Sequence, residues 1–256
     1  VIADSAEAIC DLGTAAKEAG LMLDVLLDVD CGMHRTGAAP DDEAVRLYRL
    51  IKETQGLRAA GLHAYDGHIG DADPAERTAN CDAAFAGVIE LRERLLQLRF
   101  PVPRLVAGGS PTFAIHAQHP DRELSPGTSV LWDFGYGDKF PDLPFEPAAA
   151  LLMRIVSKPG TNRLCLDLGH KAVAAENPQP RVRLLELPDA TAVMHSEEHL
   201  VIETPRAGEF RIGQCLHGIP RHICPTVALH SEAWVIDDGV ARERWPISAR
   251  ARRLQV

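Results

Sequence analysis

Hydrophobic and polar positions alternate with two different periods along the first half of the chain. Apolar residues recur at helical spacing in three segments, 4–19, 41–54 and 75–99. Apolar runs of strand length lie between them, at 21–30, 56–65 and 101–110. Strands and helices that follow one another in this order are typical of parallel βα units.

The pattern changes near Ser125, where short apolar runs are broken by proline and glycine. These runs predict strands within 128–134, 147–156, 162–169, 181–187, 199–205 and 226–237. We therefore expect an α/β domain over 1–125 and an antiparallel all-β domain over 126–256. A complete (β/α)₈ barrel takes about 250 residues by itself. The first domain is thus either a small open sheet or a partial TIM-type barrel whose first strands are missing.

Composition narrows the class of protein and of partner. The chain of 256 residues is 46% hydrophobic and 25% charged, which fits a globular protein. Its formal net charge of -9 argues against nucleic acid or an anionic membrane surface, so a small molecule is the expected partner. No apolar run reaches the roughly 20 residues of a membrane-spanning helix. Six scattered cysteines indicate reduced thiols and a cytoplasmic protein.

Two polar clusters follow predicted parallel strands, where α/β folds keep their chemistry. The first, VDCGMHRTGAAP, contains Arg35, although an ordinary surface arginine also fits this spacing. The second, GLHAYDGHIGD, offers Tyr65 and His68 as the preferred pair to stack on a planar cofactor and to move protons. His63 in the same cluster is as well explained by a structural role.

A glycine-rich turn, AGGSPTF, follows the third strand. Successive amides of Gly109 and Ser110, with the hydroxyl groups of Ser110 and Thr112, could form an anion site for a phosphate. Glycine pairs are also common in ordinary turns, so this motif is weak by itself.

The segment PRHICPTVALHSEAW is the most specific of the motifs. His222 and Cys224 are separated by one residue at what we expect to be a strand start, so both side chains would leave on one face. Imidazole with thiolate suits zinc, while manganese or magnesium are the alternatives. A buried cysteine beside a surface histidine is the competing interpretation.

Taken in order, the motifs DCGMHRTG, GLHAYDGH, GGSPT, PGTSVLWD, LDLGHKA, SEEH and HICPT resemble the D-threonine aldolase and D-serine dehydratase family. The resemblance implies an alanine-racemase-like, type III pyridoxal-phosphate fold, with a barrel followed by a β domain. It implies that Arg35 and Tyr65 lie beside the pyridoxal ring, and that Gly109, Ser110 and Thr112 hold the phosphate. It also implies that His222 and Cys224 bind the metal.

One departure concerns the lysine that carries the cofactor in this family. That lysine lies on the first barrel strand, and no segment of this chain matches it. The five lysines lie in helix, loop or β-domain contexts, at Lys17, Lys52, Lys139, Lys158 and Lys171. We therefore expect that the chain is the C-terminal two-thirds of an enzyme and lacks the Schiff-base lysine.

The resemblance implies a pyridoxal-phosphate- and metal-dependent lyase that acts on D-β-hydroxy amino acids. We favour the D-threonine aldolase reaction, which gives glycine and acetaldehyde, with His68 as the catalytic residue. Cys224 favours the alternative, a zinc-dependent D-serine dehydratase that gives pyruvate and ammonia. A non-catalytic pyridoxal-phosphate carrier and an inactive fragment are further alternatives. A homodimer is implied by the resemblance alone.

Overall fold

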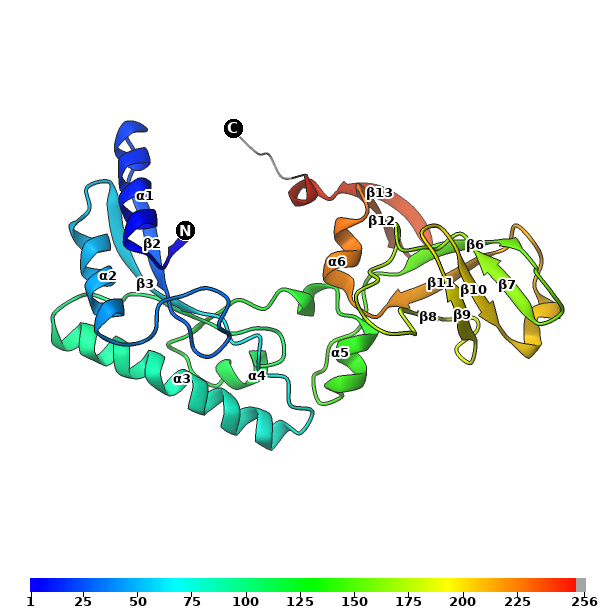
Figure 1. Ribbon diagram of the computed structural model, residues 1–256, viewed down its shortest axis with the longest axis horizontal. Helices are drawn as coiled ribbons and strands as arrows, with labels where there is room; N and C mark the ends of the chain where they lie inside the picture. The colour runs from blue at the N-terminus through cyan, green and yellow to red at the C-terminus, as the bar shows by residue number, and fades with distance from the viewer. Residues whose placement is uncertain (252–256) are drawn as a thin grey trace. The chain divides into compact units, whose positions relative to one another are not determined.

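The computed structural model describes residues 1–251, which form two compact units. The first is Val1–Gly127, and the second begins at Thr128. Each unit has a hydrophobic core of its own. Figure 1 shows helices and strands alternating in the first unit and strands dominating the second.

The first unit is a parallel α/β sheet with its strands in chain order, β1-β2-β3-β4-β5. Its elements are β1 (Ile2–Ala3), α1 (Ala6–Glu18), β2 (Leu23–Asp28), α2 (Asp42–Glu53), β3 (Leu57–Ala64), α3 (Pro74–Gln97), β4 (Leu105–Ala107), α4 (Phe113–His116) and β5 (Glu123–Leu124). This order, in which each strand pairs with the next one along the chain, is that of a (β/α) barrel segment. The three long helices and three main strands fall where the sequence predicts them.

Local signals explain where the three long helices begin. The side chains of Ser5, Asp41 and Asp73 accept hydrogen bonds from backbone N–H groups of the first turns of α1, α2 and α3. Pro74 stands in the first turn of α3, where no N–H is required. The apolar faces of these helices pack on β2 and β3 around the fully buried side chain of Tyr48.

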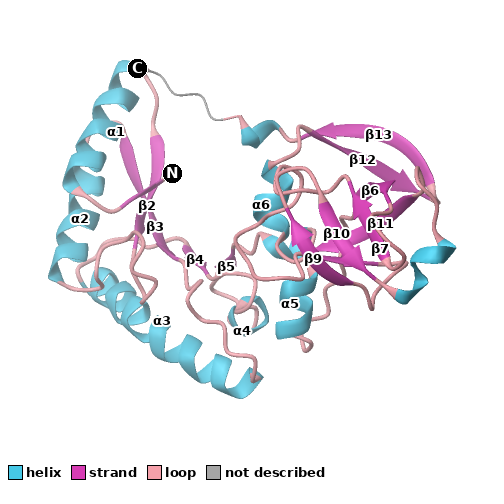
Figure 2. Ribbon diagram, turned by 45° about the vertical axis from the view of Figure 1, so that its right-hand side comes forward, coloured by secondary structure: helices cyan, strands magenta, loops and turns pink. Residues whose placement is uncertain are grey.

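The second unit is built on a six-stranded antiparallel sheet with strand order β8-β11-β6-β7-β10-β9. These strands are β6 (Leu151–Ser157), β7 (Arg163–Leu166), β8 (Val182–Leu184), β9 (Thr191–His195), β10 (Leu200–Glu203) and β11 (Cys215–Pro220). A separate ribbon pairs β12 (Glu232–Asp237) with β13 (Val240–Pro246). Figure 2 distinguishes the magenta strands of this unit from its short helices.

Two segments expected to be strands are helical. Residues 128–134 form the 3-10 turn η1 (Thr128–Val130) and the start of α5 (Phe134–Lys139). The segment after β11 forms α6 (Ile223–Ala228), so the prediction of a strand start at His222 and Cys224 was wrong. Pro225 is the physical reason, because proline has no N–H for a β-ladder but is tolerated in the first turn of a helix.

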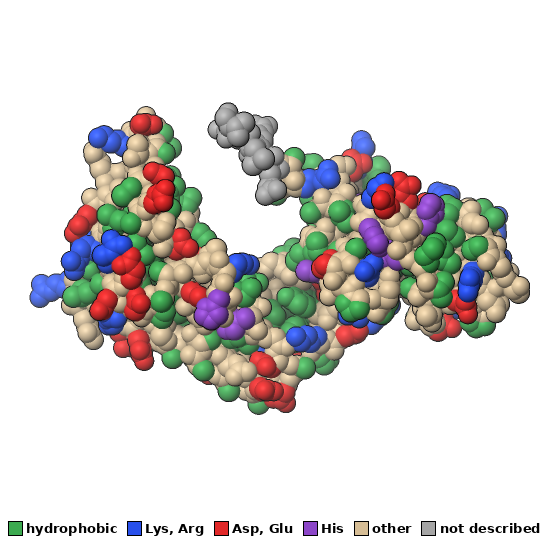
Figure 3. All heavy atoms as spheres, viewed as in Figure 1, with side chains coloured by type: hydrophobic (Ala, Val, Ile, Leu, Met, Phe, Trp, Pro, Cys, Tyr) green, Lys and Arg blue, Asp and Glu red, His purple; other side chains and the backbone are tan. Residues whose placement is uncertain are grey.

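Short 3-10 turns complete the second unit, at η2 (Pro205–Glu209) and η3 (Ser248–Arg250). Within residues 1–251, no helix combines the length and the apolar character that crossing a bilayer requires. Figure 3 shows histidine side chains, in purple, on the surface of each unit.

Candidate functional site

The loops that follow β2, β3 and β4 carry the predicted cofactor residues of the first unit. The guanidinium carbon of Arg35 lies 4.6 Å from the centre of the Tyr65 ring. A Cβ atom on Gly109 would lie 3.2 Å from Cε2 of Tyr65, so the ring packs on the glycine turn. The structure therefore brings Arg35, Tyr65 and Gly109 together at one edge of the parallel sheet.

His68 lies over the loop that carries Arg35. A Cβ atom on Gly32 would lie 2.9 Å from Nε2 of His68, and Gly32 has φ +120°, a conformation that other residues rarely adopt. Glycine at this position thus lets the imidazole pack directly on the backbone. The His68 side chain is exposed, which leaves it accessible to a ligand.

His63 has a buried carboxylate partner that sequence reasoning missed. Its Nδ1 lies 2.6 Å from Oδ1 of Asp28, which is 4% exposed, and Thr36 donates to the other carboxylate oxygen at 2.8 Å. Asp28 and His63 are opposite one another in the parallel pairing of β2 and β3. The sequence could have indicated this pair only through a correct prediction of the register between β2 and β3.

A second buried carboxylate, Asp66, organises the glycine turn. Oδ1 of Asp66 accepts hydrogen bonds from the N–H of Gly109 at 2.8 Å and from the hydroxyl of Thr112 at 2.9 Å. Its Oδ2 lies 2.8 Å from Nε2 of His116, and both side chains are fully buried. The predicted phosphate donors Gly109 and Thr112 are therefore engaged within the protein.

The protonation state of His116 follows from its second partner. Arg122 donates to Nδ1 of His116 at 2.8 Å, so Nδ1 carries a lone pair and Nε2 carries the proton given to Asp66. Burial by itself would raise the pKa of Asp66, but hydrogen bonds from His116, Thr112 and Gly109 outweigh it and hold this pKa below the usual value. Asp66 is thus a carboxylate.

Cys81 completes this cluster. Ligand atoms of Asp66, Cys81 and His116 all lie within 4.8 Å of one another, which is a spacing a metal ion could use. Burial, with the charge of Asp66 nearby, raises the pKa of the Cys81 thiol to about 12, so the thiolate that a metal requires is disfavoured. The three side chains satisfy one another, and we assign the cluster to hydrogen bonding.

Ser110 remains available to an anion. It is 4% exposed, and within the part of the chain that the structure describes neither its hydroxyl nor its N–H has a hydrogen-bond partner. The hydroxyl oxygen is not sealed from solvent, so an acceptor from outside the chain can reach it. The donor set of this turn, with Arg35 and the Tyr65 ring beside it, fits a planar cofactor that carries a phosphate.

His222 and Cys224 lie together in the second unit, although on a helix start and not on a strand. His222 is the N-cap of α6 and Cys224 is in its first turn. The neighbouring Cys224 side chain, followed by the Glu176 carboxylate, raises the pKa of His222 to about 9 against the effect of burial. His222 in turn lowers the pKa of Cys224, and the Thr128 hydroxyl contributes to this from 3.2 Å.

This lowered pKa gives the cysteine the chemistry of a metal ligand, because the thiolate is the form that binds metals. Cys224 is exposed, so an ion has access to it. The buried carboxylate of Asp133 fixes the backbone beside the pair, because it accepts hydrogen bonds from the N–H of Ile223 at 2.9 Å and from that of Tyr136 at 2.8 Å. The donor set fits a soft divalent ion such as zinc.

Another histidine pair lies in the β domain. The rings of His170 and His195 are edge-to-face with centres 4.5 Å apart, and Arg181 donates to both. Burial, together with His170 and Arg181, lowers the pKa of His195 to about 4. His195 is therefore a neutral ring that packs edge-to-face on His170 beside Arg181.

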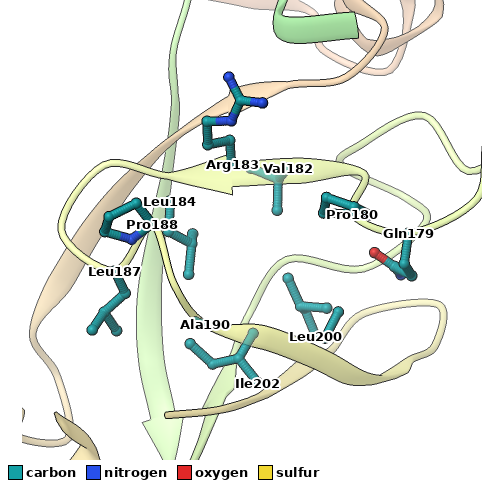
Figure 4. Close-up of a pocket in the computed structure, with 11 residues that line it drawn as sticks. Gln179, Pro180, Val182, Arg183, Leu184, Leu187, Pro188, Ala190, Leu200 and Ile202 are labelled. Atoms are coloured by element: carbon teal, nitrogen blue, oxygen red, sulfur yellow. The ribbon is translucent and has the colours of Figure 1, made fainter. Parts of the chain in front are cut away.

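The same unit contains a pocket of about 200 Å³ between strands β8 and β10. Figure 4 shows its apolar lining, which includes Val182, Leu184 and Leu200. None of the predicted site residues lines this pocket, and its walls belong to the core of the β domain.

Comparisons with known proteins match both units. The alanine racemase N-terminal domain family matches residues 1–133, and the serine dehydratase domain family matches residues 148–236. D-threonine aldolase of an Arthrobacter species is 30% identical over 255 residues, covering 98% of this chain and 67% of that protein. The chain belongs to the D-threonine aldolase family of alanine-racemase-fold proteins.

Two further relatives agree with this family. The 3-hydroxy-D-aspartate aldolase of Paracoccus denitrificans (strain Pd 1222) is 27% identical over 98% of this chain and 67% of its own length. The crystal structure of D-threonine aldolase from Filomicrobium marinum has a TM-score of 0.91 and 27% identity, over 98% of this chain and 69% of that one.

These similarities confirm the predicted fold class, a partial alanine-racemase-type barrel followed by a β domain. They also confirm that the family is one of pyridoxal-phosphate-dependent lyases.

Proposed function

We propose that this D-threonine aldolase family member cleaves D-β-hydroxy amino acids with pyridoxal phosphate and a divalent metal, converting D-threonine to glycine and acetaldehyde. The similarity to D-threonine aldolase over 98% of the chain carries this proposal. The paired His222 and Cys224 give it independent chemical support, because a substrate β-hydroxyl is a group that a Lewis acid activates.

The cofactor would be held by the loops of the first unit. Pyridoxal phosphate, when bound, withdraws electrons from the bonds at the α-carbon of an amino acid. Tyr65 would lie beside the ring system, and Arg35, already stacked on Tyr65, would orient its polar groups. Ser110 would bind the phosphate through its unpaired N–H and hydroxyl, with Gly109 and Thr112 shaping the turn that presents them.

The metal would be held by His222 and Cys224, with zinc favoured by the thiolate and manganese or magnesium as alternatives. His68 is the side chain that we propose to transfer a proton, because it is exposed and rests on the loop of Arg35. Metal binding thus rests on the imidazole and thiol groups of His222 and Cys224, and proton transfer on the imidazole of His68.

D-serine dehydratase activity is the second candidate, with pyruvate and ammonia as products. The match of residues 148–236 to the serine dehydratase domain family and the thiolate at Cys224 favour it. We also propose a homodimer in the cytoplasm. Six free cysteines suit a reducing compartment, and the net charge of -9 favours a small substrate over nucleic acid or a membrane.

The test incubates the complete protein with pyridoxal phosphate, zinc and D-threonine, L-threonine or D-serine. We expect glycine and acetaldehyde from D-threonine, and no turnover of L-threonine. Pyruvate from D-serine as the main product would favour the dehydratase, and no turnover of any of the three would refute both.

A further inference from the structure

His222 of the proposed metal pair has a carboxylate partner that neither the motifs nor the family assignment supplies. Its Nδ1 lies 2.5 Å from Oε1 of Glu176, 46 residues earlier in the chain. We infer that Glu176 is the positioning residue of the metal site: its carboxylate holds the Nδ1 proton of His222 and leaves Nε2 for the ion. This inference rests on the proposed function, because it requires a metal at His222 and Cys224.

The tautomer is the first reason. The imidazole that binds a metal is neutral and carries one proton, and in the absence of a partner that proton can sit on either nitrogen. A carboxylate at Nδ1 fixes the proton there, so the lone pair of Nε2 is free for coordination. It also makes the ring a stronger electron donor to the ion.

The rigidity of the arrangement is the second reason. Asn177 donates to the same Oε1 of Glu176 at 2.8 Å, which fixes the carboxylate. The hydroxyl of Thr226 donates to the carbonyl of His222 at 2.7 Å and accepts from the N–H of Ala174 at 3.2 Å. Thr226 thus connects the helix that carries His222 to the segment that carries Glu176.

Charge is the third reason. A divalent ion brings two positive charges, and the Cys224 thiolate compensates one of them. The ionised carboxylate of Glu176, held through the imidazole, supplies the second negative charge close to the ion. Glu176 and Cys224 therefore supply two negative charges on either side of His222, which favours a divalent cation there.

The same unit contains a matched control. Glu186 accepts from Nδ1 of His217 at 2.7 Å, a pair of the same kind. His217 lies on β11, whereas His222 and Cys224 lie together at the start of α6. Glu186→Gln consequently removes a similar carboxylate from a histidine that is not part of the proposed metal pair.

The experiment measures Zn²⁺ affinity of the complete protein at neutral pH by competition with a chromophoric chelator. We expect Glu176→Ala to weaken binding by about 10–100-fold. Glu176→Gln, which keeps an oxygen acceptor but loses the charge, should weaken binding by a smaller factor, and Glu186→Gln should leave it unchanged. The Glu176 side chain is 48% exposed, so its substitution should preserve the fold, which circular dichroism checks.

Cobalt spectra separate positioning from direct coordination. With Co²⁺ in place of zinc, the thiolate charge-transfer band and the ligand-field bands should be the same in wild type and in Glu176→Ala at saturation. Altered ligand-field bands would make Glu176 a ligand and overturn the positioning role, as would wild-type zinc affinity in Glu176→Ala.

His222→Ala identifies failure at the earlier step. If that substitution leaves zinc affinity unchanged, the metal pair of the proposed function is wrong, whatever Glu176 does. If His222→Ala weakens binding and Glu176→Ala does not, only the inference about Glu176 fails.

Discussion

The buried network around Asp66 allows a prediction that tests the deduced proton positions. In Asp66→Asn, the side-chain amide replaces the oxygen that faces Nε2 of His116, so two N–H donors meet. His116 cannot simply change its tautomer, because Arg122 donates to Nδ1. A buried donor left without an acceptor costs about 1–3 kcal/mol, and we expect a loss of stability of about this size for the first unit.

Removing Arg122 should relieve part of that loss. In Asp66→Asn with Arg122→Met, Nδ1 can carry the proton and Nε2 can accept from the asparagine amide. We expect the double variant to be more stable than the sum of the single effects by about 1–3 kcal/mol, the size of coupling between residues in one network. Asp24→Asn, which breaks an exposed pair with Arg58, is the control and should change stability little.

Urea unfolding followed by circular dichroism measures these changes, and hydrogen exchange of peptides that contain Asp66 and His116 localises them. Fluorescence monitors the second unit separately, because all three tryptophans lie there, at Trp132, Trp234 and Trp245. Strictly additive effects of Asp66→Asn and Arg122→Met would refute the assigned tautomer of His116.

Three more outcomes are expected. The pKa of Asp66 is lowered on folding, so the ionised carboxylate stabilises the fold fully above the pKa of an unfolded aspartate, about 3.9, and this stabilisation is lost as the pH falls below that value. Urea unfolding measured at a series of acidic pH values checks this. His195, with a pKa of about 4, should stay neutral at pH 6 in NMR titration, and a midpoint near 6.5 would contradict its burial. Cys224→Asp should shift metal preference from zinc toward manganese and raise the ratio of aldol cleavage to dehydration. EDTA should abolish turnover. An unchanged metal preference and product ratio in Cys224→Asp would exclude His222 and Cys224 as the ligand pair.

Most of the first unit could be predicted from local signals. Caps at Ser5, Asp41 and Asp73 and the periodicity behind them locate α1, α2 and α3, because these signals act within a few residues of one another. The segments of 128–134 and 223–228 were predicted wrongly, since short apolar runs fit a strand and a helix equally well.

The candidate site, too, could be predicted only in part. The side chains at the ends of β2, β3 and β4 were predictable, because carboxyl ends of parallel strands meet at one edge. Asp28 beside His63 was not predictable, because the pairing depends on strand register. Gly109 and Thr112 were expected to be free for a phosphate, yet Asp66 binds both.

By itself, the sequence therefore determined the order of the elements, the family and the residue types that carry the chemistry. The tertiary structure decided which of those residues are partners. Asp66 and His116 are 50 residues apart and Glu176 and His222 are 46 apart, so no local pattern connects them. Hydrogen bonds of buried groups are satisfied by whichever side chain the packed fold brings within reach, and this is a property of the whole chain.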